Sequence, residues 1–430
     1  MSEHSSIRNK LSLASATLLQ MGNAAAADDT DNGWDISTAV LFYQENNGRV
    51  SAIEPVISGS RELAEGEKIN LKLVLDSLTG ASPNGAHASS SVQTFTNPSG
   101  RQTYTVTPGD TPLDDTFLDT RVALSGSWEM PVLDEYSRVI LGANLSKEYD
   151  YASLGASASF QRDTNNRNTT YSVSLGLNAD TISPSGGIPT PFANMRVADS
   201  GTNRDGANDT KTITDLMFGL TQVINRRTLM QFNLGLSESS GYMNDPYKII
   251  SLIDDVTGLP ITPADSNDLP YLYENRPDAR SRQIFFWKTV HHLTEDVINV
   301  SYRYHTDDWG IDSHTIDFHY RYELGNGQYL QPHLRYYSQG AADFFTTSLV
   351  DGQPLPQYAS SDYRLGEFET RTIGLKYAMR TGETGEFSVR AELISQTQND
   401  VTTPIGDQAD YDLTPDLDSY IVQVGYNFRF

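Results

Sequence analysis

Apolar and polar side chains alternate with a period of two along most of the chain, and its final segment shows this most clearly. There Tyr420, Val422, Val424, Tyr426, Phe428 and Phe430 alternate with Ile421, Gln423, Gly425, Asn427 and Arg429. Successive side chains of a β-strand point to opposite faces, so such a run is typical of a strand with one apolar face. Runs of this kind predict sixteen strands, at residues 34–45, 49–58, 67–78, 117–129, 137–148, 152–162, 169–181, 212–223, 228–240, 282–292, 297–307, 313–323, 329–340, 364–379, 386–397 and 418–430. Pro55 in the second run and a change of facing near Arg371 in the fourteenth leave fourteen strands as an alternative.

The connections between these runs alternate between short and long, which favours a membrane barrel over a soluble β-sandwich. The short ones are residues 131–137, 163–168, 224–227, 293–296, 324–328 and 380–385, and the long ones are 79–115, 182–208, 241–281, 341–361 and 397–417. Transmembrane barrels have short periplasmic turns, longer extracellular loops and aromatic girdles near the strand ends. An open sheet would leave unpaired edge groups in lipid, so the strands must close. We therefore predict an all-β fold, a transmembrane antiparallel up-and-down β-barrel, with residues 28–430 as its single domain.

Both ends of the chain carry signals of export. Residues 1–27 read as a signal peptide, with Arg8 and Lys10 before a modest apolar stretch and small residues at 24–27. A disordered N-terminal tail is the alternative. At the other end, Gln423, Gly425, Phe428 and Phe430 match the ending typical of barrels inserted by the outer-membrane assembly machinery. The predicted location is the bacterial outer membrane, with its lipid and that machinery as partners.

Composition removes several classes of function. The chain of 430 residues has no cysteine, which excludes zinc fingers, iron–sulfur clusters, thiol chemistry and disulfides. Its 31 Lys and Arg against 55 Asp and Glu give a net charge of -24, so nucleic acid and anionic membrane surfaces are not expected partners. No apolar run reaches the roughly 18 residues that a spanning helix needs.

The same alternation places charged side chains on the face opposite the apolar one, along one part of the predicted lumen wall. These residues are Arg303, His305, Asp317, His319, Arg321, Glu323, His333 and Arg335. Because side chains paired across neighbouring strands lie about 5 Å apart, they form a mixed-charge ladder. The ladder is either a hydrated, mutually compensated wall or a solute-selecting constriction.

Histidines concentrate in the same region, since His291, His292, His305, His314, His319 and His333 are six of the seven that follow the signal. Neutral imidazoles on adjacent strands suit a transition metal. Their positions scatter along the strands, so one site could hold two or three at most. We expect no metal and no cofactor.

Four segments resemble a family of bacterial outer-membrane proteins of about this length that is classified only as a domain of unknown function. They are Asp76–Ala86 (DSLTGASPNGA), Asn244–Lys248 (NDPYK), Tyr273–Pro277 (YENRP) and Asp307–Thr315 (DDWGIDSHT). The resemblance spans the whole predicted barrel. It implies a barrel in the cell envelope and no particular activity.

By the assignment of short turns to the periplasm, all four segments lie at the extracellular end. We expect them to pack together as a cap or constriction over the lumen, in which Gly80, Pro83 and Gly85 allow a tightly turned segment to fold inward. Arg276, Arg280 and Arg282 are expected to pair with Asp307, Asp308 and Asp312. The candidate cap residues are Asp76, Gly80, Pro83, Gly85, Arg276, Arg280, Arg282, Asp307, Asp308, Trp309, Asp312 and His314.

The long loops carry more acidic than basic residues, and the last of them, together with the adjoining Asp418, holds six aspartates with no basic residue between them. Such a field attracts cations to a pore mouth. The predicted function is passive, porin-like passage of small hydrophilic solutes or ions. The alternative is a non-conducting barrel, plugged by its loops as a surface receptor or serving as a sleeve for a periplasmic partner. An enzyme is not expected, because the neighbours Ser313 and His314 point to opposite faces and no other nucleophile–base pair stands out.

Overall fold

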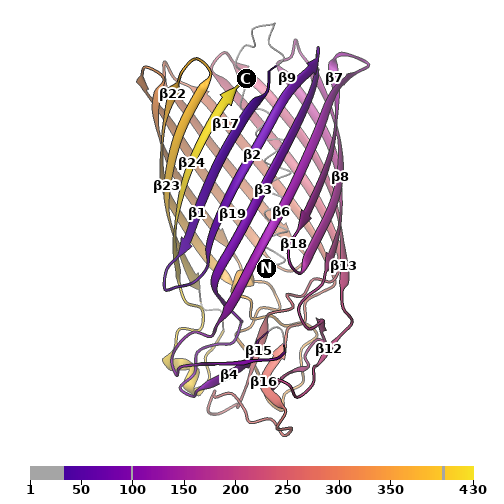
Figure 1. Ribbon diagram of the computed structural model, residues 1–430, viewed down its shortest axis with the longest axis vertical. Coiled ribbons are helices and arrows are strands. Elements are labelled where there is room, and N and C mark those ends of the chain that lie inside the picture. Colours follow the sequence, from indigo (N-terminus) through magenta and orange to yellow (C-terminus); the bar gives the residue numbers. More distant parts are fainter. Residues whose placement is uncertain (1–32, 98–99, 400–401) are drawn as a thin grey trace.

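The computed structural model describes residues 33–97, 100–399 and 402–430, and the proposed signal peptide lies outside them. Sixteen antiparallel strands form a closed barrel, in which β1 pairs with both β2 and β24 (Figure 1). In ring order they are β1 (Asp35–Glu45), β2 (Ser51–Ala64), β3 (Glu67–Pro83), β6 (Leu113–Val132), β7 (Asp134–Lys147), β8 (Tyr151–Thr164), β9 (Thr169–Ile182), β13 (Asp209–Asn225), β14 (Thr228–Gly241), β17 (Ala279–His292), β18 (Val297–Asp307), β19 (Asp312–Gly325), β20 (Gln328–Gln339), β22 (Glu367–Thr381), β23 (Gly385–Asn399) and β24 (Leu417–Arg429).

The predicted fold class is confirmed, and the strand number is sixteen rather than fourteen. Pro55 lies inside β2, where the ladder to β3 steps from Ile53–Ser77 to Val56–Val74. The proline, which has no N–H to donate, therefore stands outside that ladder. Several strands run further than their alternating segments, since β2 continues to Ala64 and β6 already begins at Leu113.

The outer face of the barrel is apolar. Large side chains such as Leu71, Leu175, Ile316 and Leu393 are 45, 46, 50 and 70% exposed. Exposed apolar side chains that recur on strand after strand form a belt that lipid can cover. No helix among the described residues has the length and apolar character required to cross a bilayer.

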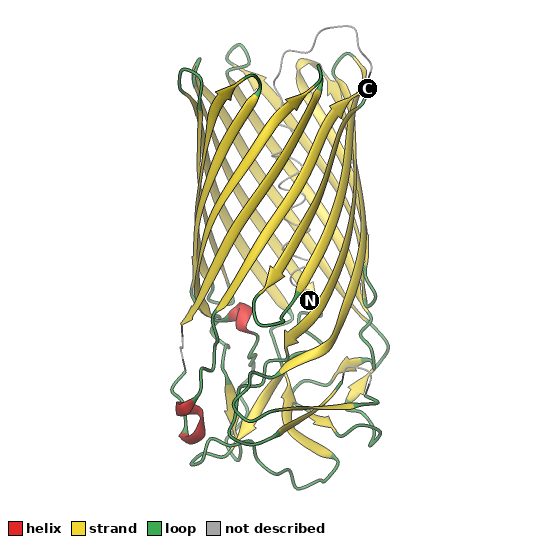
Figure 2. Ribbon diagram, turned by 60° about the vertical axis from the view of Figure 1, so that its left-hand side comes forward, coloured by secondary structure: helices red, strands yellow, loops and turns green. Residues whose placement is uncertain are grey.

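Short turns lie at one end of the barrel and the long loops at the other, as Figures 1 and 2 show. At the turn end the start of β1 lies beside the end of β24, with Asp35 opposite Arg429. We call the opposite end the loop end.

Five long loops fold together at the loop end into one unit, here called the cap, made of the described residues in 84–112, 183–208, 242–278, 340–366 and 402–416. Its main sheet has the strand order β11-β16-β15-β21 and draws on three different loops. The strands of the cap are β4 (Gln93–Thr96), β5 (Thr103–Val106), β10 (Ile188–Pro189), β11 (Asn194–Arg196), β12 (Arg204–Asp205), β15 (Ile249–Ile253), β16 (Asp268–Tyr273) and β21 (Ser348–Val350). Two 3-10 helices, η1 (Tyr363–Leu365) and η2 (Gly406–Asp410), complete it (Figure 2).

The cap has an apolar core of its own. Phe95, Met195, Ile249, Tyr271 and Tyr273 are buried together there, and they come from three loops. The rings of Phe95 and Tyr271 lie 4.5 Å apart between centroids, within the range of favourable aromatic pairs. The loops are thus held to one another by burial of apolar surface, as in a small domain.

Candidate functional site

The loops of the cap cross the opening of the barrel. Lys248 and Ile249 follow β14, the ninth strand of the ring, whereas Pro83 ends β3, the third strand, and Asn84 comes directly after it. The Lys248 ammonium donates to the Pro83 carbonyl, and Ile249 N donates to Asn84 O at 2.9 Å. The strands β3 and β14 lie six places apart in a ring of sixteen. For the segments that leave them to touch, the loops must reach over the lumen.

Gly85 makes the closest approach at this crossing. It has φ +100°, and a Cβ there would lie 2.4 Å from Ile249 O and 2.8 Å from Ser361 Oγ. Ser361 in turn donates to Ile249 O at 2.6 Å, so three loops meet at this carbonyl. Only a residue without a side chain fits both the conformation and the space.

A buried cluster of charges, here called the cap cluster, lies beside this crossing and consists of Asp245, Lys248, Glu274, Arg276, Asp362 and Arg364. Arg276 and its partners Glu274 and Asp362 have side chains at most 1% exposed, with N–O distances of 2.7 and 2.9 Å. Arg364 bridges Asp362 at 2.5 Å and Asp245 at 2.7 Å. Three cations and three carboxylates offset one another, and all of these side chains are buried except that of Arg364, which is 14% exposed.

Burial and the neighbouring charges shift the pKa values of this cluster in different directions. Burial of the Glu274 carboxyl raises its pKa to about 7, although Arg276 opposes the shift. Burial would also raise the pKa of Asp362, but Arg364, Lys248 and Arg276 hold it well below its usual value. Asp362 is therefore the anion on which the cluster depends.

The predicted arginine–aspartate pairs form only in part. Arg280 pairs with Asp307, with Nε and Nη2 at 2.8 and 2.5 Å from Oδ2. Arg276 binds Glu274 and Asp362 instead, and Arg282 donates to Ser239 Oγ at 2.6 Å. Arg276 follows β16 within the cap, while Arg282 points into the barrel from β17, so the two lie in different layers.

The two remaining aspartates of that hypothesis bind neutral donors. Asp308 accepts the Ser281 N–H at 2.9 Å, and Asp312 accepts the Tyr304 hydroxyl at 3.1 Å. His314 belongs to the outer face of β19 rather than to the cap, since Tyr302 OH lies 2.8 Å from its Nδ1.

Trp309 fastens the β18–β19 turn to the cap. Its side chain is 2% exposed and packs with Ile311, Ala342 and Leu365. Its indole N–H donates to Ala279 O at 2.8 Å, and the Arg280 guanidinium lies 4.3 Å from the ring centroid. Through Trp309, the Asp307–Thr315 segment packs against Leu365, the residue that follows Arg364 of the cap cluster.

Asp76 and Gly80 lie on the wall below the cap. Asp76 is buried on the inner face of β3 and pairs with Arg121 of β6, with Arg121 Nη2 at 2.5 Å from Oδ2. Gly80, at φ +120°, lets the strand pass the Arg49 carbonyl, where a Cβ would come within 2.6 Å.

The predicted lumen residues share the inner face of β18, β19 and β20. Register pairs Asp317 with Arg335 and His319 with His333 across β19 and β20. Nearer the turn end, Arg321 pairs with Glu323 and lies over Tyr329, 3.8 Å from its ring centroid. Arg303 and His305 stand on β18 toward the loop end.

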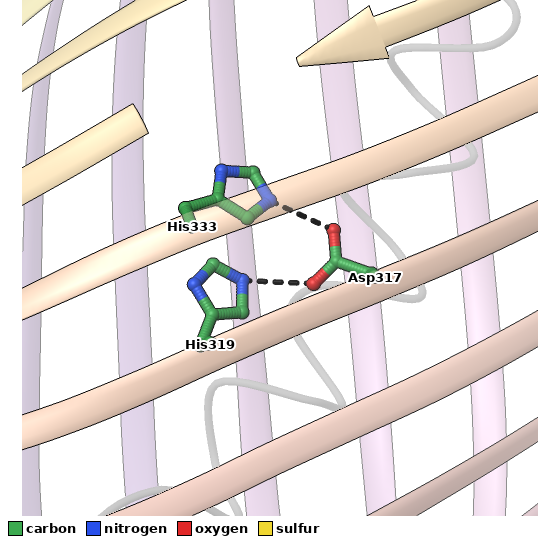
Figure 3. A group of neighbouring side chains, drawn as sticks. All are labelled: Asp317, His319 and His333. Atoms are coloured by element: carbon green, nitrogen blue, oxygen red, sulfur yellow. Dashed lines mark hydrogen bonds and ion pairs between the residues drawn. The ribbon is translucent and has the colours of Figure 1, made fainter. Parts of the chain in front are cut away.

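Three of these side chains come together near the middle of the wall (Figure 3). His319 Nε2 lies 2.8 Å from Asp317 Oδ1, and His333 Nε2 lies 3.0 Å from Asp317 Oδ2. The other ring nitrogen of His333, Nδ1, lies 2.9 Å from Glu392 Oε1. Among the described residues, Asp317, His319 and His333 thus form a group of neighbouring side chains whose atoms could bind a metal ion.

Glu392 and Gly374 were missed by the sequence reasoning. Glu392 is on β23, two strands from His333, and it reaches across β22 at Gly374, where a Cβ would lie 2.7 Å from Glu392 Cγ. The only signal in the sequence is an inward-facing glycine between two strands with charged inner faces.

The residues of the proposed assembly signal form the end of the barrel seam. Gln423 accepts from Arg390 Nη2 at 2.6 Å, and Gly425 lies opposite Ala39 of β1. The Phe428 ring stacks against that of Phe430, with centroids 6.1 Å apart.

The sequence matches a known protein family over nearly its whole length. A family model with the description "Protein of unknown function (DUF3570)" matches residues 8–428. The chain belongs to this family. The predicted resemblance is thereby confirmed for nearly the whole chain. No curated protein sequence matches it.

Solved barrel structures show distant likenesses. A bacterial polysaccharide outer membrane secretin has a TM-score of 0.42 and 7% identity, over 94% of this chain and 100% of the other. CdiB from Acinetobacter baumannii has a TM-score of 0.45 and 7% identity, over 92% of this chain and 60% of the other. The siderophore receptor PirA from Acinetobacter baumannii has a TM-score of 0.40 and 10% identity, over 86% and 54%. The chain thus matches little more than half the length of these last two proteins, and none of these likenesses bears on its function.

Proposed function

We propose that the protein is a channel of the bacterial outer membrane, through which small hydrophilic solutes and ions pass passively. The observation that carries this proposal is the inner wall of β18–β20, which bears charged side chains from Arg303 to Arg335. Charges on the inside of a barrel need water around them, because an unsolvated ion costs several kcal/mol even after relaxation. A hydrated lumen is the natural medium for such a wall. We assign the protein no catalysed reaction.

The cap sets what enters this lumen. Its loops cross the opening and carry more acidic than basic residues, so the field at the mouth attracts cations and repels anions. Once past the cap, a solute meets the basic residues Arg303 and Arg335 on the lumen wall. The acidic last loop, by contrast, has no basic residue among its aspartates. A mouth of one sign and a wall of both signs favour small cations and zwitterions over anions.

The rival function is a non-conducting barrel whose cap is a surface receptor. The observation that favours it is the core shared by the loops, which gives them the rigidity of a preformed binding surface. The two functions differ in whether the cap leaves a continuous path for ions.

Single-channel recording in a planar bilayer under a salt gradient tests the proposal. Wild-type protein should give discrete conductance steps with a reversal potential displaced toward that of a cation-selective pore. Arg276→Met breaks the cap cluster and should enlarge or destabilise the steps. Arg196→Met removes a partly exposed cap pair with Asp268 at 2.8 Å and should leave them unchanged. Silence from wild type and Arg276→Met alike, with heat-modifiable barrels in both, would reject the channel in favour of the receptor.

A further inference from the structure

The group formed by Asp317, His319 and His333 has a composition unlike the rest of the charged wall. Nearer the turn end of this wall, an arginine faces a carboxylate in the pair of Arg321 with Glu323. Here two imidazoles share one carboxylate, on adjacent strands and near mid-wall. Two histidines with one carboxylate, and an open side toward water, form a ligand set typical of divalent transition metals.

We propose that Asp317, His319 and His333 bind one divalent transition-metal ion, with Zn²⁺ as the reference ion, at the lumen wall. One ligand atom from each of the three side chains lies within 4.8 Å of the other two. Tetrahedral Zn²⁺ holds such atoms at about 2.0–2.2 Å from the metal and so about 3.3 Å from one another. Modest side-chain rotation brings the three atoms to that spacing. The fourth position faces the lumen, for water or a passing solute.

The two imidazoles differ in their freedom to make this adjustment. Their rings stack at 4.1 Å between centroids and 8° between planes, so one ring must turn to aim its lone pair at a shared ion. His319 has a side chain 26% exposed, whereas that of His333 is 9% exposed. His333 is therefore the fixed ligand, and His319 is the ring that rotates toward the ion.

The surroundings of His333 are those of a metal-binding histidine. Its Nδ1 lies 2.9 Å from the Glu392 carboxylate, which fixes the tautomer that leaves Nε2 to coordinate the ion. Metal-ligating histidines usually donate their other ring N–H to a carboxylate or carbonyl in this way. Glu392 is 6% exposed in its side chain and is held in turn by Arg390 at 3.4 Å.

Gly374 makes this support possible. It lies between His333 and Glu392 in the register of β20, β22 and β23, and a Cβ there would come within 2.7 Å of Glu392 Cγ and 3.1 Å of its Oε1. Any side chain at this position displaces the carboxylate from the imidazole. Glu392 and Gly374 are thus positioning residues, and neither would touch the ion.

The competing explanation is that a proton occupies the place of the metal. An imidazolium between two carboxylates would satisfy the same contacts by hydrogen bonds and ion pairing. That arrangement takes up no metal in a fixed ratio, so stoichiometric binding separates the two explanations.

The test is a titration of folded, tag-free, chelator-treated protein in detergent with Zn²⁺, followed by calorimetry, and with Co²⁺, followed by its visible absorption. We expect one ion per chain and Co²⁺ bands typical of coordination by nitrogen and oxygen. His333→Gln and His319→Gln should each abolish the stoichiometric step. Gly374→Ala should weaken affinity about 10- to 100-fold, the usual effect of losing a supporting carboxylate.

A matched control removes two histidines that lie outside the group. The double change His291→Gln with His292→Gln alters a pair at the β17–β18 turn and should leave the ratio and the affinity unchanged. Heat-modifiable migration checks that each variant folds. The proposal is overturned if wild type takes up no ion in fixed ratio, or if His319→Gln and His333→Gln bind as wild type does. Channel activity enters none of these readouts, so the result does not depend on the proposed function.

Discussion

Replacement of Asp362 by asparagine should open the cap without unfolding the barrel. The Asp362 carboxylate is fully buried and pairs with Arg276 at 2.9 Å and Arg364 at 2.5 Å. Asparagine keeps the shape but removes the charge, which leaves three cations facing the two carboxylates of Asp245 and Glu274. An uncompensated buried charge of this kind costs about 3–5 kcal/mol.

That cost should be confined to the cap, because the barrel strands are joined to one another by ladders that do not involve Asp362. Native-state hydrogen exchange measures it locally. The amides of β15 and β16 should exchange about a hundredfold to several thousandfold faster in the variant, since 1.4 kcal/mol is a factor of ten. The amides of β7–β9 should keep their rates.

A control for this experiment lies beside the same sheet, in the loop before β16. Asp265 forms a half-exposed pair with Arg196 at 3.1 Å, and Asp265→Asn should leave exchange in β15 and β16 unchanged. Rates in Asp362→Asn within threefold of wild type would refute the argument that the cap cluster holds the loops together.

Two further predictions concern the cap. Gly85→Ala should also speed hydrogen exchange in β15, because the new Cβ would lie 2.4 Å from the Ile249 carbonyl oxygen. The control Gly201→Ala has a similar φ of +103° and nothing within 4 Å, so it should cost only its backbone strain. Equal effects of the two changes would refute the steric argument. Burial lowers the pKa of His87, whose Nε2 lies 3.0 Å from Gln408 Nε2, so the opened cap binds a proton that the closed cap excludes. The stability that neutral, buried His87 gives the closed cap is therefore fully present above a pH of about 6.5. It is lost as the pH falls below that value. Protease cleavage of the cap should rise on acidification more steeply in wild type than in His87→Gln, and parallel pH profiles would contradict this.

The barrel could be predicted from the sequence because each strand faces two different environments. Lipid outside and water inside impose a period of two on every strand, as at residues 418–430, and the turn lengths then give the order of neighbours. The same pattern does not fix the strand ends, since β2 and β6 continue past the region where lipid imposes it.

The cap could not be predicted in this way. Ile249–Ile253 reads as a short apolar run without alternation, because it is buried on both sides. Its partner β21 lies almost a hundred residues away and pairs in parallel, which no local pattern indicates. Four residues of the cap cluster lie in the segments 244–248 and 273–277, which are predicted to pack in the cap, but nothing in the sequence indicates that Asp362 and Arg364 join them. An aspartate in a long loop is ordinarily solvated.

The histidine site falls between these cases. Periodicity places Asp317, His319 and His333 on the inner face, but it does not show that Glu392 reaches them. That contact skips a strand and depends on the missing side chain of Gly374. The face to which a side chain points follows from the pattern of its own strand. The contact between His333 and Glu392 depends on three strands, β20, β22 and β23.

The sharing of one sheet among loops from distant strands has a consequence for how this family can diverge. A loop that contacts only solvent can gain or lose residues independently of its neighbours. Here the β11-β16-β15-β21 sheet joins segments from three loops, and the Ile249 N–H binds a fourth at Asn84 O, so a deletion in one loop withdraws a partner from the others. Loop lengths among relatives should therefore change in concert, and a barrel of this family that loses one long loop should have lost the companions that pair with it.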